Sequence, residues 1–383
     1  MSKTIYFDNS ATTKIFPEAA ESMLKTMQTY YANPSSLHAL GNQAHRLLES
    51  ARKQAVTILG CTPEEVFFTG SGTESDNWAV KGTALEKAGA GKHLITSQVE
   101  HPAIMNTMHA LEKQGFDVTY LPVDQTGKIN PEDLKSAIRP DTTLVSIMAI
   151  NNEIGSQQPI SQLAEVLEDY PSIHFHVDGV QSFMKTPRPL IHDRVDLMSF
   201  SAHKFNGPRG CGILYKKANR QILPLLDGGG QEHLLRSSTE NLPAIVATVK
   251  AMRLTQEGAA EEKLRHQSFQ DRLRQFLAEE ADQVTVFSPE DGAAHILCFA
   301  LKGVRGEVMV HALEEEGIYV STTSACSSRK SQQGSSTLAA MPVDPSLARC
   351  AIRLSFGQDN RMDEIESFIA VYRRLLHKFA KIQ

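Results

Sequence analysis

The chain has 383 residues and a formal net charge of -5, and 22% of its residues are charged, as is usual for a globular protein. Its length predicts two domains, because single hydrophobic cores stop growing beyond about 250–300 residues. The basic residues are spread along the chain, which argues against direct binding of nucleic acid. No run of about eighteen apolar residues predicts a membrane span, and the first residues lack an apolar signal core. We therefore expect a cytoplasmic protein with no membrane partner.

Helical and strand patterns alternate between residues 17 and 257. Apolar residues recur at helical spacing in 17–30 and 44–59. Short runs rich in β-branched and aromatic residues predict seven strands, at 66–70, 93–97, 117–123, 143–150, 173–179, 196–202 and 212–215. Short apolar strands that alternate with helices predict a mostly parallel sheet between helices, which is an α/β architecture.

The pattern changes after residue 258. A charged helical stretch is followed by predicted strands and helices, at 295–301, 306–317, 318–326, 350–357 and 362–380. This order predicts a smaller α+β domain at 258–383, together with the N-terminal segment 1–15, beside a large domain at 16–257. The stretch "SSRKSQQGSS" at 327–336 directly follows Cys326, and its composition suggests a mobile loop.

Five cysteines are scattered along the chain without a C-x-x-C pair. Their odd number and wide spacing argue against a disulfide framework or a structural zinc site. We expect Cys61, Cys211, Cys298 and Cys350 to pack as small buried hydrophobic side chains, which would make an exposed thiol informative.

Polar residues follow several of the predicted strands, at the edge where open parallel sheets bind their ligands. The run from Gly70 to Thr73 comes after the first strand and before a helix, so its backbone N–H groups could hold a phosphate. An ordinary strand-to-helix turn uses the same residue types, so this run alone does not identify a site. Other strands are followed by His101, Asn152, Asp178, Gln181, Ser201, His203 and Lys204.

Each of these residues also has an ordinary structural use. His101 and Asp178 could cap helices. Lys204 could be a solvated lysine, a phosphate contact, or an amine that forms a Schiff base with a carbonyl. Together, however, an anion cup, an imidazole, an amide, a carboxylate and a lysine are the parts needed to hold pyridoxal 5'-phosphate. We expect no metal, because the histidines lack regular ligand spacing, and no G-x-S-x-G nucleophile motif occurs.

The chain resembles the cysteine desulfurases, which belong to the class V aminotransferase group of fold-type I pyridoxal-phosphate enzymes. The matching stretches are "YFDNSATT" (6–13), "NPSSLH" (33–38), "GSGTESDN" (70–77), "EHPAI" (100–104), "NNEIG" (151–155), "HVDGVQS" (176–182), "SAHKFNGPRG" (201–210), "GGGQE" (228–232), "RSSTEN" (236–241), "SACSS" (324–328) and "IRLSFG" (352–357). They run in family order over nearly the whole chain. The resemblance implies the fold-type I transferase fold, with the seven-stranded sheet in the large domain.

The resemblance also implies roles for single residues. Lys204 would be the Schiff-base lysine, His101 would stack on the cofactor ring and assist acid–base steps, and Cys326 would be the catalytic cysteine. Asp178 would pair with the pyridine nitrogen, and Gln181 would bind the ring hydroxyl. The phosphate contacts would be Gly72, Thr73, Ser201, His203 and, from the other subunit of a homodimer, Thr239. Asn152 would contact the cofactor and, with Arg353, hold the substrate carboxylate, a task that suits the guanidinium fork.

The implied reaction converts L-cysteine to L-alanine and leaves sulfur as a persulfide on Cys326. A sulfur-acceptor protein would then receive it for iron–sulfur cluster assembly or tRNA thiolation. A selenocysteine lyase or another class V aminotransferase would keep the same fold, although Cys326 argues against an aminotransferase. A scaffold without turnover is the alternative outside the enzymes, and the intact catalytic set argues against it. Ala202, Cys211 and Ser238 depart from residues common in the family, but none of them replaces a catalytic group.

Overall fold

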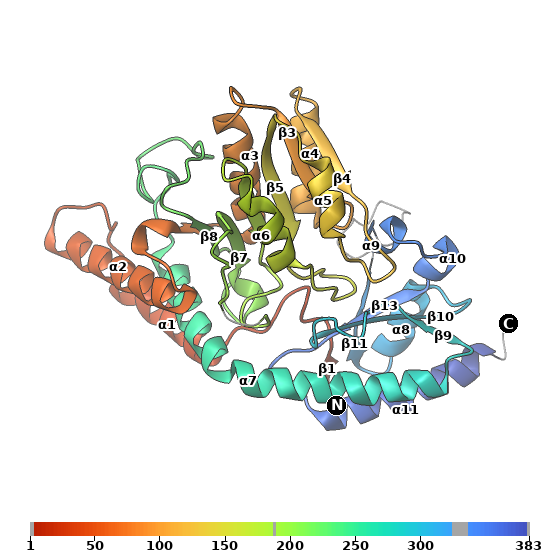
Figure 1. The fold of residues 1–383 in the computed structure, drawn as a ribbon. Coiled ribbons are helices and arrows are strands. Elements are labelled where there is room, and N and C mark those ends of the chain that lie inside the picture. The colour runs from red at the N-terminus through yellow and green to blue at the C-terminus, as the bar shows by residue number, and fades with distance from the viewer. Residues whose placement is uncertain (1–3, 187–188, 324–335, 381–383) are drawn as a thin grey trace.

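The computed structural model describes residues 4–186, 189–323 and 336–380. Its centre is a seven-stranded sheet with the order β2-β8-β7-β6-β5-β3-β4 (Figure 1). The strands are β2 (Val66–Thr69), β3 (His93–Ser97), β4 (Asp117–Leu121), β5 (Thr142–Met148), β6 (His174–Asp178), β7 (Leu197–Ser201) and β8 (Gly212–Lys216). β8 is antiparallel to both neighbours, and the other pairs are parallel. The predicted mostly parallel α/β sheet is therefore confirmed.

Helices cover both faces of this sheet. On one face, α3 (Gly72–Glu86) and α4 (Pro102–Glu112) share a core with Leu94 and Leu144. On the other face, α2 (Ala39–Leu59), α6 (Ile160–Glu168) and the first part of α7 (Leu242–Glu279) share a core with Val145. Adjacent residues of β5 thus enter different cores, as the two-residue period of a strand requires. The same half of the chain holds α1 (Pro17–Thr29), α5 (Pro131–Ala137) and the short 3-10 helices η1 (Pro63–Glu65) and η2 (Ala202–Lys204).

A second sheet is antiparallel and has the order β12-β13-β10-β9. Its strands are β9 (Val284–Val286), β10 (Ile296–Leu301), β12 (Ser321–Thr322) and β13 (Ala351–Ser355). The N-terminal β1 (Ile5–Tyr6) pairs with β11 (Ile318–Tyr319) beside it. The helices of this part are α8 (Gly306–Glu314), α9 (Ser336–Ala340), α10 (Pro345–Ala348) and α11 (Met362–Ala380). The pairing of β1 with β11 brings the first residues of the chain to this smaller sheet.

The long helix α7 connects the two sheets (Figure 1). Its N-terminal residues enter the core of the large sheet, whereas Phe269, Leu273 and Phe276 enter the core beside the small sheet. The division into 16–257 and 258–383 with 1–15 stays a prediction, and its boundary falls inside this continuous helix. No helix in the described ranges combines the length and the apolar character needed to cross a membrane.

Candidate active site

A cavity of about 280 Å³ lies where the strands of the large sheet end. Because β8 is antiparallel to β2 and to β7, β2 points in the same direction as β5, β6 and β7. The residues that follow these strands therefore meet at one edge. Nine of the predicted site residues line the cavity: Gly72, Thr73, His101, Asn152, Asp178, Gln181, Ser201, His203 and Lys204. Ser10, Ala11, Asp76, Met148, Ile150 and Val180 also line it. Four of them lie within the stretches that resemble the family, but the sequence analysis gives none of the six a role of its own.

The first turn of α3 forms the anion cup. Ser71 caps the helix, since its Oγ accepts a hydrogen bond from the Glu74 N–H at 3.1 Å. A Cβ atom at Gly72 would lie 2.8 Å from Cγ2 of Val180 and 3.0 Å from Cβ of Ser201, so a larger residue would push the helix away from β7. Free N–H groups at a helix start attract anions. With the nearby Ser201 and His203 side chains, this turn fits a phosphate group.

Lys204 lies in η2, directly after β7. Its Nζ donates hydrogen bonds to the carbonyl oxygens of Ser10 at 2.5 Å and Ala11 at 2.9 Å. In the same turn, Nδ1 of His203 lies 3.2 Å from Oγ1 of Thr12, and burial lowers the pKa of His203 to about 4. The N-terminal segment thus forms one wall of the site and orients its lysine.

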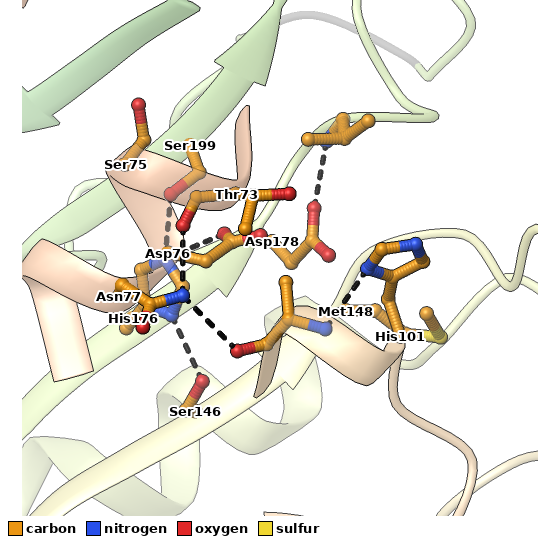
Figure 2. Close-up of polar contacts among 12 residues, drawn as sticks. Thr73, Ser75, Asp76, Asn77, His101, Ser146, Met148, His176, Asp178 and Ser199 are labelled. Atoms are coloured by element: carbon orange, nitrogen blue, oxygen red, sulfur yellow. Dashed lines mark hydrogen bonds and ion pairs between the residues drawn. The ribbon is translucent and has the colours of Figure 1, made fainter. Parts of the chain in front are cut away.

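Asp178 is the last residue of β6 and is almost fully buried. Its Oδ1 accepts the Val180 N–H at 2.9 Å (Figure 2). Burial raises the pKa of Asp178 to about 6, while the Val180 N–H and the Lys204 charge act in the opposite direction. This carboxyl group is therefore mainly ionised above that pH and can hold a protonated ring nitrogen.

His101 is both the N-cap of α4 and a residue of the cavity, so its two predicted uses coexist. Its Nδ1 accepts the Ala103 N–H at 3.1 Å (Figure 2). Burial, helped by the Lys204 charge, lowers the pKa of His101 to about 4, so the ring is neutral at pH 7. Because Nδ1 is an acceptor, the neutral ring carries its proton on Nε2.

Arg353 lies on β13 and connects the small sheet to the site. Its Nη1 donates to the Asn152 carbonyl oxygen at 2.8 Å, and its Nη2 donates to Oδ1 of Asp8 at 2.8 Å. Arg353 is buried and does not itself line the cavity, whereas Asn152 does. Thr239 is exposed and does not line the cavity of its own chain. Cys326 and residues 327–335 lie outside the described residues.

The four described cysteines are separate from this cavity. Cys211, Cys298 and Cys350 are buried, as predicted, whereas Cys61 is half-buried. Burial raises the pKa of Cys61 and of Cys211 to about 12, so neither is a thiolate at pH 7. Burial also raises the pKa of Cys298 and of Cys350. Such thiols are poor nucleophiles.

The side chains around the cavity fit pyridoxal 5'-phosphate. The cup, the Lys204 amine and the Asp178 carboxylate match its phosphate, its aldehyde and its ring nitrogen. Gln181 donates from Nε2 to the Ser10 carbonyl at 3.0 Å, while its buried Oε1 has no hydrogen-bond partner in the described part of the chain. That acceptor fits a hydroxyl group of a ligand. Within the described residues, no cluster of side chains suited to a metal ion occurs.

Comparisons with known proteins agree with this geometry. The family described as aminotransferase class-V matches residues 5–368. A "NifS/IcsS protein homolog" of Lactobacillus delbrueckii subsp. bulgaricus is 52% identical over 381 residues, covering 99% of this chain and 98% of the relative. A "Cysteine desulfurase IscS" of Methanosarcina thermophila is 40% identical over 376 residues, covering 98% of this chain and 93% of the relative. A solved NifS-like protein is 35% identical with a TM-score of 0.90, and each chain is covered to 100%.

Proposed function

The chain belongs to the class-V aminotransferase family and is a pyridoxal-phosphate-dependent cysteine desulfurase, and we propose that Cys326 carries the sulfur that it removes from L-cysteine. The other product is L-alanine, and a sulfur-acceptor protein receives the outer sulfur atom of the persulfide for iron–sulfur cluster assembly or tRNA thiolation, which regenerates the Cys326 thiol. The observation that carries the proposal is the meeting of Lys204, Asp178, His101 and the α3 cup around one cavity.

We propose that different residues of the cavity bind different parts of the cofactor. Gly72, Thr73, Ser201 and His203 hold the phosphate, Asp178 holds the pyridine nitrogen, and Gln181 holds the ring hydroxyl. When bound, pyridoxal phosphate supplies an aldehyde that amines attack and a ring that accepts electrons from the substrate. The Ser10 and Ala11 carbonyl groups orient Lys204, whose Nζ would hold the cofactor by its aldehyde carbon and would carry protons to and from the substrate.

His101 and Arg353 have supporting tasks in this proposal. The His101 ring is neutral, and its Nδ1 lone pair is used by the Ala103 N–H, so it donates a hydrogen bond from Nε2. Protonation at Nδ1 would break the cap of α4, which makes Lys204 Nζ the better proton carrier. Arg353, held by Asp8 and Asn152, directs positive charge toward the substrate carboxylate.

Sulfur leaves by attack of the Cys326 thiolate on the sulfur atom of the substrate. An S–S bond forms and the C–S bond breaks. The substrate carbon keeps the electron pair and takes a proton, so that L-cysteine and the thiol become L-alanine and a persulfide. Thiolates carry out such attacks, whereas the high pKa values of Cys61 and Cys211 leave those thiols protonated.

A homodimer is part of the proposal. Large apolar side chains are exposed on two segments that adjoin the same surface hollow, and they include Leu24, Met27, Tyr31, Leu37, Leu40, Leu223, Leu226 and Leu234. A second copy of the chain would cover them, since groups of exposed apolar side chains mark surfaces of association. Thr239 follows the second segment and is exposed, so it could reach the phosphate site of the partner.

Mass spectrometry after brief exposure to L-cysteine tests the proposal. We expect one added sulfur on the Cys326 peptide, none on the peptides of the other four cysteines, and one L-alanine per persulfide. Cys326→Ser should bind the cofactor but gain no sulfur, and Cys350→Ser, whose thiol is buried, should behave as the unmutated chain. Persulfide on another cysteine would contradict the role of Cys326. Turnover of L-selenocysteine but not L-cysteine would indicate a selenocysteine lyase.

A further inference from the structure

A row of buried polar side chains lies between β6 and α3, next to Asp178. His174, His176 and Asp178 alternate along β6 and so point to one face of the sheet. On α3, Asp76 and Thr83 lie two turns apart and face this row. Nδ1 of His174 lies 3.3 Å from Oγ1 of Thr83. Nε2 of His176 lies 3.7 Å from Oδ1 of Asp76 (Figure 2). Burying this many polar groups costs stability unless they are hydrogen-bonded. The presence of the row therefore points to a function.

His176 is fixed by two hydroxyl groups from neighbouring strands. Oγ of Ser146, on β5, lies 2.9 Å from its Nδ1, and Oγ of Ser199, on β7, lies 3.0 Å from its Nε2 (Figure 2). The ring is fully buried, and burial lowers the pKa of His176 to about 3. His176 is therefore neutral at pH 7 and gives Asp76 no cation to pair with.

Asp76 lines the cofactor cavity together with Asp178 but is placed differently. The residue is 1% exposed, and its Oδ1 has no hydrogen-bond partner in the described part of the chain. Asp178 instead has the Val180 N–H on one oxygen and the charge of Lys204 nearby. Two buried carboxylates that line one cavity repel each other, so one of them retains its proton, and the proton stays on the group with fewer donors.

The titration of the surrounding groups supports this assignment. Burial and then the Asp178 charge raise the pKa of Asp76 well above its usual range, Glu100 adds to the increase, and the Ser199 hydroxyl opposes it. The charged or titratable groups that act on the pair are His176 on β6, Glu100 after β3, and Lys204 after β7. Lys204 favours ionisation of Asp178, so the pair holds one proton at neutral pH, on Asp76.

We propose that Asp76 is a positioning residue, a neutral carboxylic acid beside Asp178 whose polar neighbours are the neutral His176 ring and the Ser199 hydroxyl. Asp178 then carries the sole negative charge among the described residues lining the cavity, and that charge faces the cofactor ring. An ionised Asp76 would share the ring charge with Asp178 and draw water into the cavity. This inference rests on the proposed cofactor contact of Asp178, and it assigns Asp76 no bond to the substrate.

Difference infrared spectroscopy at pH 7.5 tests the protonation of Asp76. Protein with 13C in its aspartate carboxyl groups should show a protonated C=O band that shifts with the label. Asp76→Asn should remove that band. Glu100→Gln, the matched control, should leave it in place, because the Glu100 band does not shift with labelled aspartate. Absence of a labelled band at pH 7.5, or its persistence in Asp76→Asn, would overturn the proposal.

Affinity for pyridoxal phosphate tests the positioning role. Asp76→Asn preserves size and a neutral group, so its dissociation constant should stay within about threefold of the unmutated value. Asp76→Leu should weaken binding about tenfold or more, because Ser199 and His176 lose a polar neighbour. Asp178→Asn should also weaken binding about tenfold. Equal losses in Asp76→Asn and Asp178→Asn would contradict the proposal. Failure of persulfide formation with the infrared band intact would count against the proposed function alone.

Discussion

At the scale of single residues, the site depends on a lysine that two backbone carbonyl groups orient. Ser10 and Ala11 accept the hydrogen bonds of Lys204 Nζ, and both belong to the N-terminal segment. A surface lysine has water as its partner and many rotamers. The side chain of Lys204 is instead held in one orientation by these hydrogen bonds, and it lines the same cavity as Asp178 and His101. That restriction prepares the amine for a bond to a carbonyl group.

We predict that Lys204→Ala abolishes covalent attachment of the cofactor. In the unmutated protein, borohydride should fix pyridoxal phosphate to the Lys204 peptide, which mass spectrometry identifies. The variant should lose both the adduct and the yellow colour of the bound cofactor. Lys302→Ala, which changes an exposed lysine, is the control and should keep both. A reduced adduct on any other lysine of the unmutated protein would end this assignment.

Glu100, which directly precedes His101, is a buried acid with an unusual titration. Ser97 Oγ and the Met148 N–H donate to its Oε1, while its Oε2 has no hydrogen-bond partner in the ranges described. Burial raises the pKa of Glu100 to about 8, against a usual value of 4.5. The folded state therefore binds a proton more tightly than the unfolded state does. Its contribution to stability is complete below about pH 4.5 and is lost as the pH rises to about 8.

We predict that the cofactor-free protein loses stability relative to Glu100→Gln as the pH rises from 6.5 to 8. The buried histidines do not affect this comparison, because both proteins contain them and their contributions cancel in the difference. Over this range, the unfolding free energy of the unmutated protein should fall by about 2 kcal/mol relative to that of Glu100→Gln. Urea denaturation at several pH values measures it. Parallel stability curves for the two proteins would show that Glu100 is already ionised.

At the scale of elements, a buried ion pair connects α2, β2 and the segment 228–236. Nη2 and Nη1 of Arg52 donate to the two carboxylate oxygens of Glu232 at 2.7 Å and 3.0 Å. Glu232 also accepts the Phe68 N–H at 2.8 Å, although its own backbone has a φ of 46°. The guanidinium lies 5.0 Å from the centre of the Phe68 ring. This connection fixes the segment that leads to Thr239.

We predict that Arg52→Met destabilises the protein by about 3–5 kcal/mol, because the Glu232 charge remains buried without a partner. The double variant Arg52→Met with Glu232→Gln should recover a large part of that loss, since no uncompensated charge remains. Urea unfolding of the two single variants and the double variant, at one protein concentration, gives the coupling free energy. A loss below about 1 kcal/mol in Arg52→Met would show that water reaches Glu232.

The elements of the large sheet could be predicted from sequence, because local pattern and strand direction decide them. β3 matches its predicted range, and the residues after β2, β6 and β7 do meet at one edge. The contacts of Ser10 and Ala11 could not be predicted, because they depend on the return of a distant segment. Asp76 follows Thr73 by less than one helical turn and looks like part of an ordinary helix. The short β9 was also missed, because three residues carry little pattern.

At the scale of the whole molecule, the N-terminal segment joins the two sheets at the site. β1 lies beside the small sheet, and Asp8 pairs with Arg353 on β13. A few residues later, Ser10 contacts Lys204, and the Thr13 N–H donates to the His203 carbonyl at 2.9 Å. The amine that would hold the cofactor and the arginine that would hold the substrate carboxylate are thus connected through four residues of chain, from Asp8 to Ala11. The long α7 also joins the two parts, because its residues enter the cores beside both sheets (Figure 1).

The proposed homodimer predicts that each active site needs residues from two subunits. If Thr239 serves the partner's site, neither Lys204→Ala nor Thr239→Ala alone has a complete site. A mixed dimer has one site with Lys204 from one subunit and Thr239 from the other, and a second site with both substitutions. We expect mixtures of the two variants, unfolded and refolded together, to regain desulfurase activity, up to half of the unmutated value per mixed dimer. Refolding each variant alone and mixing afterwards is the control and should restore less. If Thr239 instead served its own chain, mixing would give no gain, and a monomer by light scattering at micromolar concentration would exclude shared sites altogether.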